Sequence, residues 1–262
     1  MKNLLRLFLI VPLLVVAAGL AACNRGAVVT DSGEITNWQF DFADFSRLDI
    51  SHAFIVDVEP ADGFSINVSV DRAVFEYLVV EKRGDTLYLG LENGNTYLDT
   101  TQRATIEMPA LEELSLSGAS RATVGVFVGA KSLELKLSGA SRADVATDTL
   151  ENASFDLSGA SRVTGSIGAA TFKLKLSGAS SANLEGSAPQ MEIDGSSAST
   201  ADLKDLPATD VKVDLSGAST AFIDVADRID ATLKGGSVVT FLGDPKLGNI
   251  DLSGASTIRK AD

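Results

Sequence analysis

The chain has 262 residues, of which 45% are hydrophobic and 22% are charged, with 35 acidic residues against 22 basic ones. This length and apolar content suffice to bury a core, and the net charge of −13 disfavours nucleic acid as a partner, because phosphate binding needs clustered lysine and arginine. A single histidine and a single cysteine leave few candidates for acid–base or metal sites and exclude an internal disulfide.

The first 22 residues have the features of a secretory signal. Lys2 and Arg6 precede an uncharged run over residues 7–22, which is shorter than the roughly 20 residues of a membrane-spanning helix. Leu20-Ala21-Ala22-Cys23 resembles the bacterial lipobox, in which the cysteine is acylated and becomes the mature N-terminus. We therefore expect residues 1–22 to be a lipoprotein signal peptide and Cys23 to attach the protein to a membrane. The alternative is an ordinary signal peptide with an unrelated cysteine.

The segment after Cys23 is small and polar, and we expect residues 23–37 to be a lipidated N-terminus and flexible tether. Asn24, at the second mature position, is not the aspartate associated with retention in the inner membrane of enteric bacteria. The outer membrane is therefore the expected location.

Residues 38–110 have β-like alternation without a clear repeat. Phe64, Ile66, Val68 and Val70 alternate with polar residues, and turn signals such as Asp62-Gly63 separate the runs. We expect wider, cap-like rungs of the same coil here; a separate small β domain is the alternative. Helical signals are weak, and only residues 72–77 are compatible with a single helical turn.

An internal repeat dominates residues 111–262. Ser-Gly-Ala-Ser occurs at 117–120, 138–141, 158–161, 177–180, 216–219 and 253–256, and diverged copies occur at 194–197 and 234–237. The copies begin 17 to 22 residues apart, and each follows a strand-like alternation such as Leu114-Ser115-Leu116.

A strand that ends in the same turn about every 19 residues predicts a coil in which each strand pairs in parallel with its copies above and below. In this fold the motif glycine takes a positive φ at the corner, the alanine points inward and the serine hydroxyls bind nearby backbone. The predicted fold class is all-β: a single-stranded parallel β-helix, or β-solenoid, covering residues 38–262, with about eight repeat rungs over 111–262.

Several units in a fixed order are similar to those of one known family. They are the Leu48–Phe54 unit, the Asp62-Gly63 turn, the Met108-Pro109 step and the Leu-x-Leu-Ser-Gly-Ala-Ser array. Over residues 38–256 the chain thereby resembles the putative auto-transporter adhesin, head GIN domain family. The resemblance implies a β-helical fold in a secreted or envelope-anchored bacterial protein, and it supplies no catalytic residues.

Candidate catalytic and metal sites are few. His52 has Ser51 and Asp49 nearby, but neighbours in a strand point to opposite faces, so we expect a structural histidine and no triad. Ser-Gly-Ala-Ser lacks the nucleophile elbow of serine hydrolases. Aspartates that recur beside the repeats are interleaved with lysines, which favours a solvated acidic surface over a calcium site. We predict no enzyme activity, no cofactor and no metal.

The residue that follows the motif is an arginine in three successive copies: Arg121, Arg142 and Arg162. Stacked rungs would bring these side chains into one column, which is either ordinary charge balancing or a binding track for an anionic ligand.

The sequence therefore predicts a non-catalytic, lipid-anchored protein of the bacterial cell envelope that acts in adhesion or ligand binding. An anionic glycan and another envelope protein are the candidate partners besides the membrane. The alternatives are a structural or regulatory envelope protein that binds another protein and, less favoured, a β-helix enzyme that acts on polysaccharide.

Overall fold

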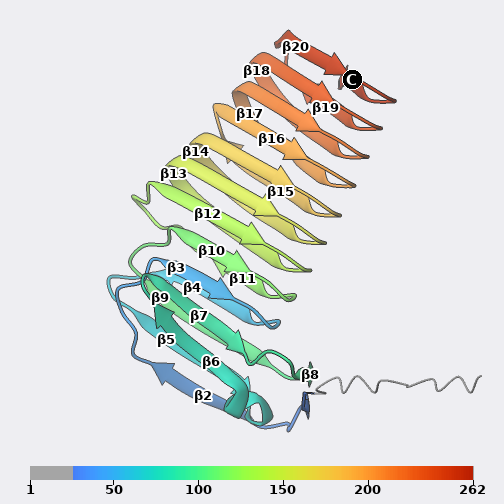
Figure 1. The fold of residues 1–262 in the computed structure, drawn as a ribbon. Helices are drawn as coiled ribbons and strands as arrows, with labels where there is room; N and C mark the ends of the chain where they lie inside the picture. Colours follow the sequence, from blue (N-terminus) through green and yellow to red (C-terminus); the bar gives the residue numbers. More distant parts are fainter. Residues whose placement is uncertain (1–25, 262) are drawn as a thin grey trace, which may run out of the picture.

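The computed structural model describes residues 26–261, and the predicted signal peptide and Cys23 lie outside this range. Strands account for 64% of the residues and helix for 3%. The molecule is a β-solenoid of about seven turns, in which parallel neighbours lie about 20 residues apart (Figure 1). The predicted fold class is confirmed.

Each rung of the repeat array has two strand faces joined by the motif corner. The first face lies before the corner and the second face lies after it. Strands confined to the first face are β10 (Glu113–Leu116), β12 (Ser132–Leu137), β16 (Gln190–Gly195) and β20 (Lys246–Leu252). Strands confined to the second face are β11 (Arg121–Val124), β15 (Ser181–Ser187), β19 (Val238–Leu242) and β21 (Thr257–Lys260). Four longer strands begin on the second face and continue to the first face of the next rung: β13 (Arg142–Leu157), β14 (Arg162–Leu176), β17 (Thr200–Leu215) and β18 (Thr220–Leu233).

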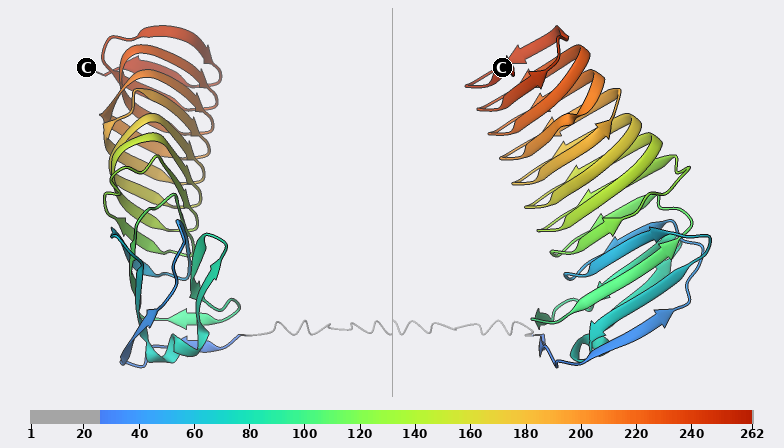
Figure 2. Two further views of the ribbon diagram at one scale, coloured as in Figure 1. Left: turned by 90° about the vertical axis from the view of Figure 1, so that its left-hand side faces the viewer. Right: turned by 180° about the vertical axis from the view of Figure 1, so that it is seen from behind.

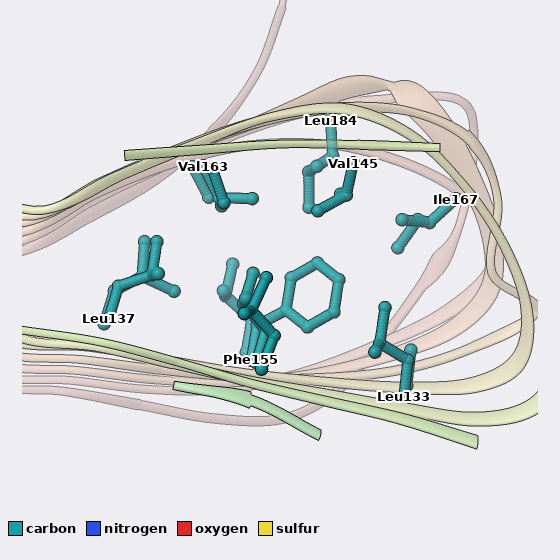
Figure 3. Close-up of a cluster of buried hydrophobic side chains, with 14 of the residues drawn as sticks. Leu133, Leu137, Val145, Phe155, Val163, Ile167 and Leu184 are labelled. Carbon is teal, nitrogen blue, oxygen red and sulfur yellow. The ribbon is translucent and has the colours of Figure 1, made fainter. Parts of the chain in front are cut away.

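The rungs stack in register because equivalent side chains fill the same place in the core. Leu114 pairs with Leu135, which pairs with Phe155, and Phe155 pairs in turn with Leu174. Viewed along the axis, side chains such as Leu137 and Phe155 enter from one face and Val163 from the other (Figure 3). The two faces thereby enclose a single narrow core.

The motif corner has the expected glycine conformation but not the expected alanine orientation. Gly159 has φ +72°, and the next residue, Ala160, donates its backbone N–H to the carbonyl of Gly139 one rung below, at 2.7 Å. Ala160 is exposed, whereas Ser161 is buried. A polar side chain in this buried position needs a hydrogen-bond partner, and the Ser161 hydroxyl has one because it donates to the carbonyl of Ser158 at 2.5 Å. The expectation that alanine points inward is therefore wrong.

The N-terminal part contains coil rungs together with antiparallel strands that the sequence did not indicate. β3 (Arg47–Ile50) and β4 (Ile55–Pro60) form a rung that pairs in parallel with β10 and β11. On its other side this rung pairs in parallel with β7 (Thr86–Leu91) and β9 (Gln102–Met108). Chain order and spatial order therefore differ here, because the rung formed by β3 and β4 lies between segments that follow it in sequence (Figure 1).

Antiparallel strands complete this end, which we call the cap. β2 (Ile35–Phe40) pairs with β5 (Ser65–Asp71), β5 pairs with β9, and β6 (Leu78–Arg83) pairs with β7. The short 3₁₀ helix η1 (Arg72–Tyr77) coincides with the single helical turn that the sequence allowed. Asp71 is its N-cap, and the Asp71 carboxylate accepts the N–H of Ala73 at 2.7 Å.

Part of the predicted tether is ordered structure. β1 (Val28–Thr30) pairs in parallel with β8 (Thr96–Leu98), and β2 begins at Ile35. Residues 28–37 are therefore part of the cap. The expectation of a flexible tether as far as residue 37 is corrected, because β1 is paired with β8 and Val29 is buried in the core although the segment's composition is polar.

Candidate functional site

The three predicted arginines form one column on the outward side of the second face. Arg121 pairs with Arg142, and Arg142 pairs with Arg162. Neighbouring strands in a sheet are about 4.8 Å apart, so the three side chains leave the backbone at successive steps of that size. Ser181 and Thr200 continue the column on the next rungs, where the positive charge ends.

The corner positions each arginine. The last serine of the motif is buried, and it is followed directly by the exposed arginine, as in Ser141–Arg142 and Ser161–Arg162. Strand alternation turns consecutive side chains to opposite sides, so burial of the serine directs the arginine outward. The Arg162 backbone N–H also donates to the Ser141 carbonyl at 2.9 Å, which fixes the register.

Sequence reasoning missed a fourth member of the column, Arg103 on β9. Arg103 pairs with Ile55 on β4, and Ile55 pairs with Arg121. The arginine column therefore consists of Arg103, Arg121, Arg142 and Arg162, with Ile55 between the first two. The missed signal was the similarity of Arg103-Ala104-Thr105-Ile106 to Arg121-Ala122-Thr123-Val124. Both contain Arg-Ala-Thr, although no Ser-Gly-Ala-Ser motif precedes Arg103.

None of the four arginines forms a salt bridge or a side-chain hydrogen bond with a side chain that the structure describes. Some lysines of the first face differ: Lys136 lies 2.8 Å from Glu113, and Lys212 lies 2.8 Å from Glu192. Among the described side chains, the arginine column is therefore a run of like charges without carboxylate partners, unlike cations such as Lys136 and Lys212.

Asp144 and Glu151 are two carboxylates that could balance the charge of these arginines. Asp144 lies two residues after Arg142 on the same outward side, in the adjacent column with Thr123 and Thr164. Glu151 is exposed at the beginning of the first-face part of β13. Neither forms an ion pair with the column within residues 26–261.

An open groove of about 280 Å³ follows the arginine column. Ile55, Ala122 and Ala143 contribute to its lining together with three of the arginines, and Thr123, Asp144 and Thr164 border it. Planar guanidinium groups at regular intervals along a groove are suited to carboxylate or phosphate groups on an extended ligand.

A larger cleft of about 630 Å³ lies against the first face near the cap, and it contains His52. His52 takes the place of the motif glycine and has φ +60°, so it lies in a turn and not in a strand. The Ser51 hydroxyl consequently lies 2.8 Å from His52 Nδ1, so the expectation that these neighbours point to opposite faces is wrong.

His52 nevertheless lacks the environment of a general base. Its Nδ1 atom also accepts the Leu91 backbone N–H at 3.3 Å, so two donors share one lone pair. Burial lowers the pKa of His52, and a hydrogen bond with Asn93 partly offsets this effect. Burial, followed by the nearby Glu113, raises the pKa of Asp49 in the same cleft, and Asp49 makes no hydrogen bond to His52 among the described side chains.

Two further features concern metal and membrane. No cluster of three or more histidine, cysteine, aspartate or glutamate side chains within the described part of the chain is placed to hold a metal ion. Of the helical segments in that part, none has the length and apolarity needed to cross a membrane.

Comparison with solved structures agrees with the β-solenoid fold. A putative adhesin from Parabacteroides merdae superposes with a TM-score of 0.82 at 14% identity, covering 90% of this chain and all of that chain. A putative adhesin and a putative lipid binding protein, both from Parabacteroides distasonis, superpose with TM-scores of 0.79 and 0.76. Both are 15% identical, and they cover 89% and 90% of this chain and all of their own. At such identities the likeness shows the fold alone.

No curated protein sequence matches the chain. A family model, by contrast, matches residues 44–245, which include the cap rungs, the arginine column and most of the repeat array. The chain belongs to the family described as putative auto-transporter adhesin, head GIN domain.

Proposed function

We propose that this protein is a non-catalytic, lipid-anchored binding module of the bacterial outer membrane that holds an acidic polysaccharide along its arginine column. The adhesin family and the structural neighbours support binding of an external partner. The arginine column supports the anionic chemistry of that partner.

The observation that carries the proposal is the absence of ion pairs at these stacked arginines within the described residues. Like charges on adjacent strands destabilise a sheet. The strand spacing of about 4.8 Å is shorter than the Debye length of about 8 Å at physiological salt, so salt screens the repulsion between the arginines only weakly. A bound polyanion relieves this repulsion at every rung. A periodic acidic glycan engages several arginines at once and thereby gains from multivalency.

The anchor is the second part of the proposal. Cys23 lies in a lipobox-like sequence, and it is the only cysteine of the chain. Acyl chains contribute about 0.8 kcal/mol per buried methylene, so several chains hold a protein stably on a membrane. Cys23→Ala is expected to release the protein into the soluble envelope fraction or to block its maturation. A mature N-terminus without acyl mass would refute the anchor and leave the arginine column untouched.

The binding test uses a triple variant in which Arg121, Arg142 and Arg162 are replaced by alanine. The matched control replaces Lys131, Lys175 and Lys234 by alanine, which removes the same charge from exposed positions outside the groove. Binding of residues 24–262 to oligogalacturonate is measured by calorimetry at low and moderate salt, after circular dichroism has established that each variant is folded.

The arginine variant is expected to bind at least about tenfold more weakly, since even one charge-assisted hydrogen bond contributes about 1.5 kcal/mol. The control is expected to keep most of the parental affinity. Equal losses of affinity in the two variants would show that binding depends only on net charge. This result would contradict specific binding at the arginine column. A parent protein that binds no acidic glycan would contradict the proposed ligand class.

A further inference from the structure

We propose that the cap end of the protein rests on the surface of a lipid bilayer through an apolar patch formed by Val28, Trp38, Phe75 and Leu98. We call these four residues the cap-end patch. The inference rests on the lipid attachment at Cys23 proposed above, and it adds an orientation of the molecule and a second membrane contact.

All four side chains of the cap-end patch are large, apolar and exposed. Val28 is 66% exposed, Leu98 46%, Trp38 43% and Phe75 36%. They belong to β1, β8, β2 and η1, which lie together at the end of the molecule opposite to the C-terminus (Figures 1 and 2). This end therefore presents apolar surface that the described part of the chain leaves uncovered.

The aromatic pair covers the end of the core. Trp38 pairs with Val68, which is buried, so the Trp38 side chain lies on the core side of the outermost cap strand. Its ring stacks on Phe75 with a centroid distance of 4.2 Å and an interplanar angle of 14°. Both rings nevertheless stay partly exposed, so the described residues do not fully cover this stack.

Val28 and Leu98 lie on the small sheet formed by β1 and β8. Their neighbours Val29 and Tyr97 pair with each other, and Tyr97 packs against Tyr77 at the end of η1. Because Val29 is buried, alternation directs Val28 outward. The small sheet thus borders the helix that carries Phe75.

The short distance in sequence between Cys23 and the first described residue indicates which surface the cap-end patch contacts. Cys23 is three residues before Gly26, the first described residue, and an extended chain spans at most about 3.5 Å per residue, or about 11 Å here. An acylated Cys23 therefore holds the bilayer surface within reach of β1, which begins at Val28. Such a short connection brings the cap, and not the repeat array, to the membrane.

The charges around the patch select the kind of membrane. Arg72 is paired with Glu34 at 3.0 Å, and Glu76 and Asp99 are exposed nearby without a basic cluster beside them. Basic residues are what attracts a protein to anionic lipid, whereas tryptophan and phenylalanine favour the interface by burying apolar area. The surface that fits is zwitterionic, such as one of phosphatidylethanolamine. In this orientation the repeat array points away from the bilayer and the arginine column runs away from it along the array (Figure 1).

The test uses Trp38 as its reporter, because it is the only tryptophan of the chain. Cys23, the only cysteine, is coupled through its thiol to a maleimide lipid in phosphatidylethanolamine–phosphatidylcholine vesicles, so docking is measured whether or not cells acylate the protein. Trp38 fluorescence is expected to shift to the blue and to be quenched by lipids brominated in the upper acyl chain. A reference protein with Trp38→Phe and Leu252→Trp carries its tryptophan at the far end, where Leu252 is 44% exposed, and it is expected to remain unquenched.

A matched pair of variants tests the patch itself. Phe75→Glu is expected to abolish most of the quenching of Trp38, while Phe222→Glu, at an equally exposed position on the repeat array (36% in both), is expected to leave it unchanged. Unquenched Trp38 in the tethered parent, or equal quenching at the two ends, would overturn the docking proposal. Blue-shifted Trp38 without vesicles, at protein concentrations that give dimers, would assign the patch to a second copy of the chain. Acylation of Cys23 is scored separately by mass, so failure of the anchor and failure of docking are distinguishable.

Discussion

Replacement of Gly159 by valine tests the stacking of the motif corners. Gly159 has φ +72°, and a Cβ atom at this position would lie 2.5 Å from the carbonyl oxygen of Gly139 on the rung below. A left-handed conformation costs an L-residue about 1–2 kcal/mol. The close contact is with backbone, so the rungs must separate locally, which also weakens the hydrogen bond from Ala160 to Gly139; such a bond contributes about 1 kcal/mol. We expect Gly159→Val to lower the free energy of unfolding by about 2–3 kcal/mol in total.

Two other glycines separate the two contributions to that cost. Gly129 has φ +80° with no atom within 4 Å of an added Cβ, so Gly129→Val carries the conformational cost alone. Gly63 has open space and no positive φ, so Gly63→Val is expected to be nearly neutral. Urea unfolding followed by far-ultraviolet circular dichroism measures all three. A Gly159→Val protein as stable as the parent, or no less stable than Gly129→Val, would refute the stacked-corner geometry.

Three further predictions concern the core, the corner and the cap. Phe155→Ala, at a fully buried ring, is expected to cost about 3–5 kcal/mol in urea unfolding, while Phe222→Ala on the surface is expected to cost much less. Ser161→Ala removes the hydroxyl that donates to Ser158 and is expected to cost about 1 kcal/mol in the same assay. Burial acts to raise the pKa of Asp71, but hydrogen bonds with the Asp31 side chain, the Ala73 backbone and Ser32 outweigh it and lower that pKa from 3.8 to about 2. The carboxylate therefore stabilises the fold above about pH 3.8, and this contribution is lost as the pH falls toward 2; Asp71→Asn is expected to remove that pH dependence.

The repeat array could be predicted from the sequence because each of its local signals repeats. Alternation such as Leu135–Leu137 marks the buried side of a strand, and the glycine of each motif marks a corner. Because the copies of the repeat are similarly spaced, parallel stacking of successive strands is the simplest fold. The same stacking brings Arg121, Arg142 and Arg162 together. The orientation of the corner residues was less accessible, since it depends on which backbone carbonyl the buried serine reaches.

The cap could not be predicted to the same extent. The rung formed by β3 and β4 lies between β7 and β9 on one side and β10 and β11 on the other, and no local pattern specifies partners that follow in sequence. The position of Arg103 depends on the same long-range pairing, and Val29 of β1 and Phe40 of β2 pack into or against the core only once β8 and β5 are in place. The similarity of Ser51-His52-Ala53 to Ser-Gly-Ala already indicates that His52 occupies a glycine position, and the pairing of β3 with β10 agrees with it.

The most direct test of the central claim is to observe the arginine side chains while a ligand binds. The Nε–Hε nuclear magnetic resonance signals of residues 24–262 are recorded during titration with oligogalacturonate. The proposal predicts that the signals of Arg121, Arg142 and Arg162 shift together, with Arg103 following for longer oligomers, because Ile55 interrupts the column. The signals of Arg83 and Arg228, which are paired with Glu81 and Asp230, are expected to remain unshifted. Unchanged column signals at saturating ligand, or equal shifts at Arg83 and Arg228, would contradict the proposal that the arginine column is the binding site.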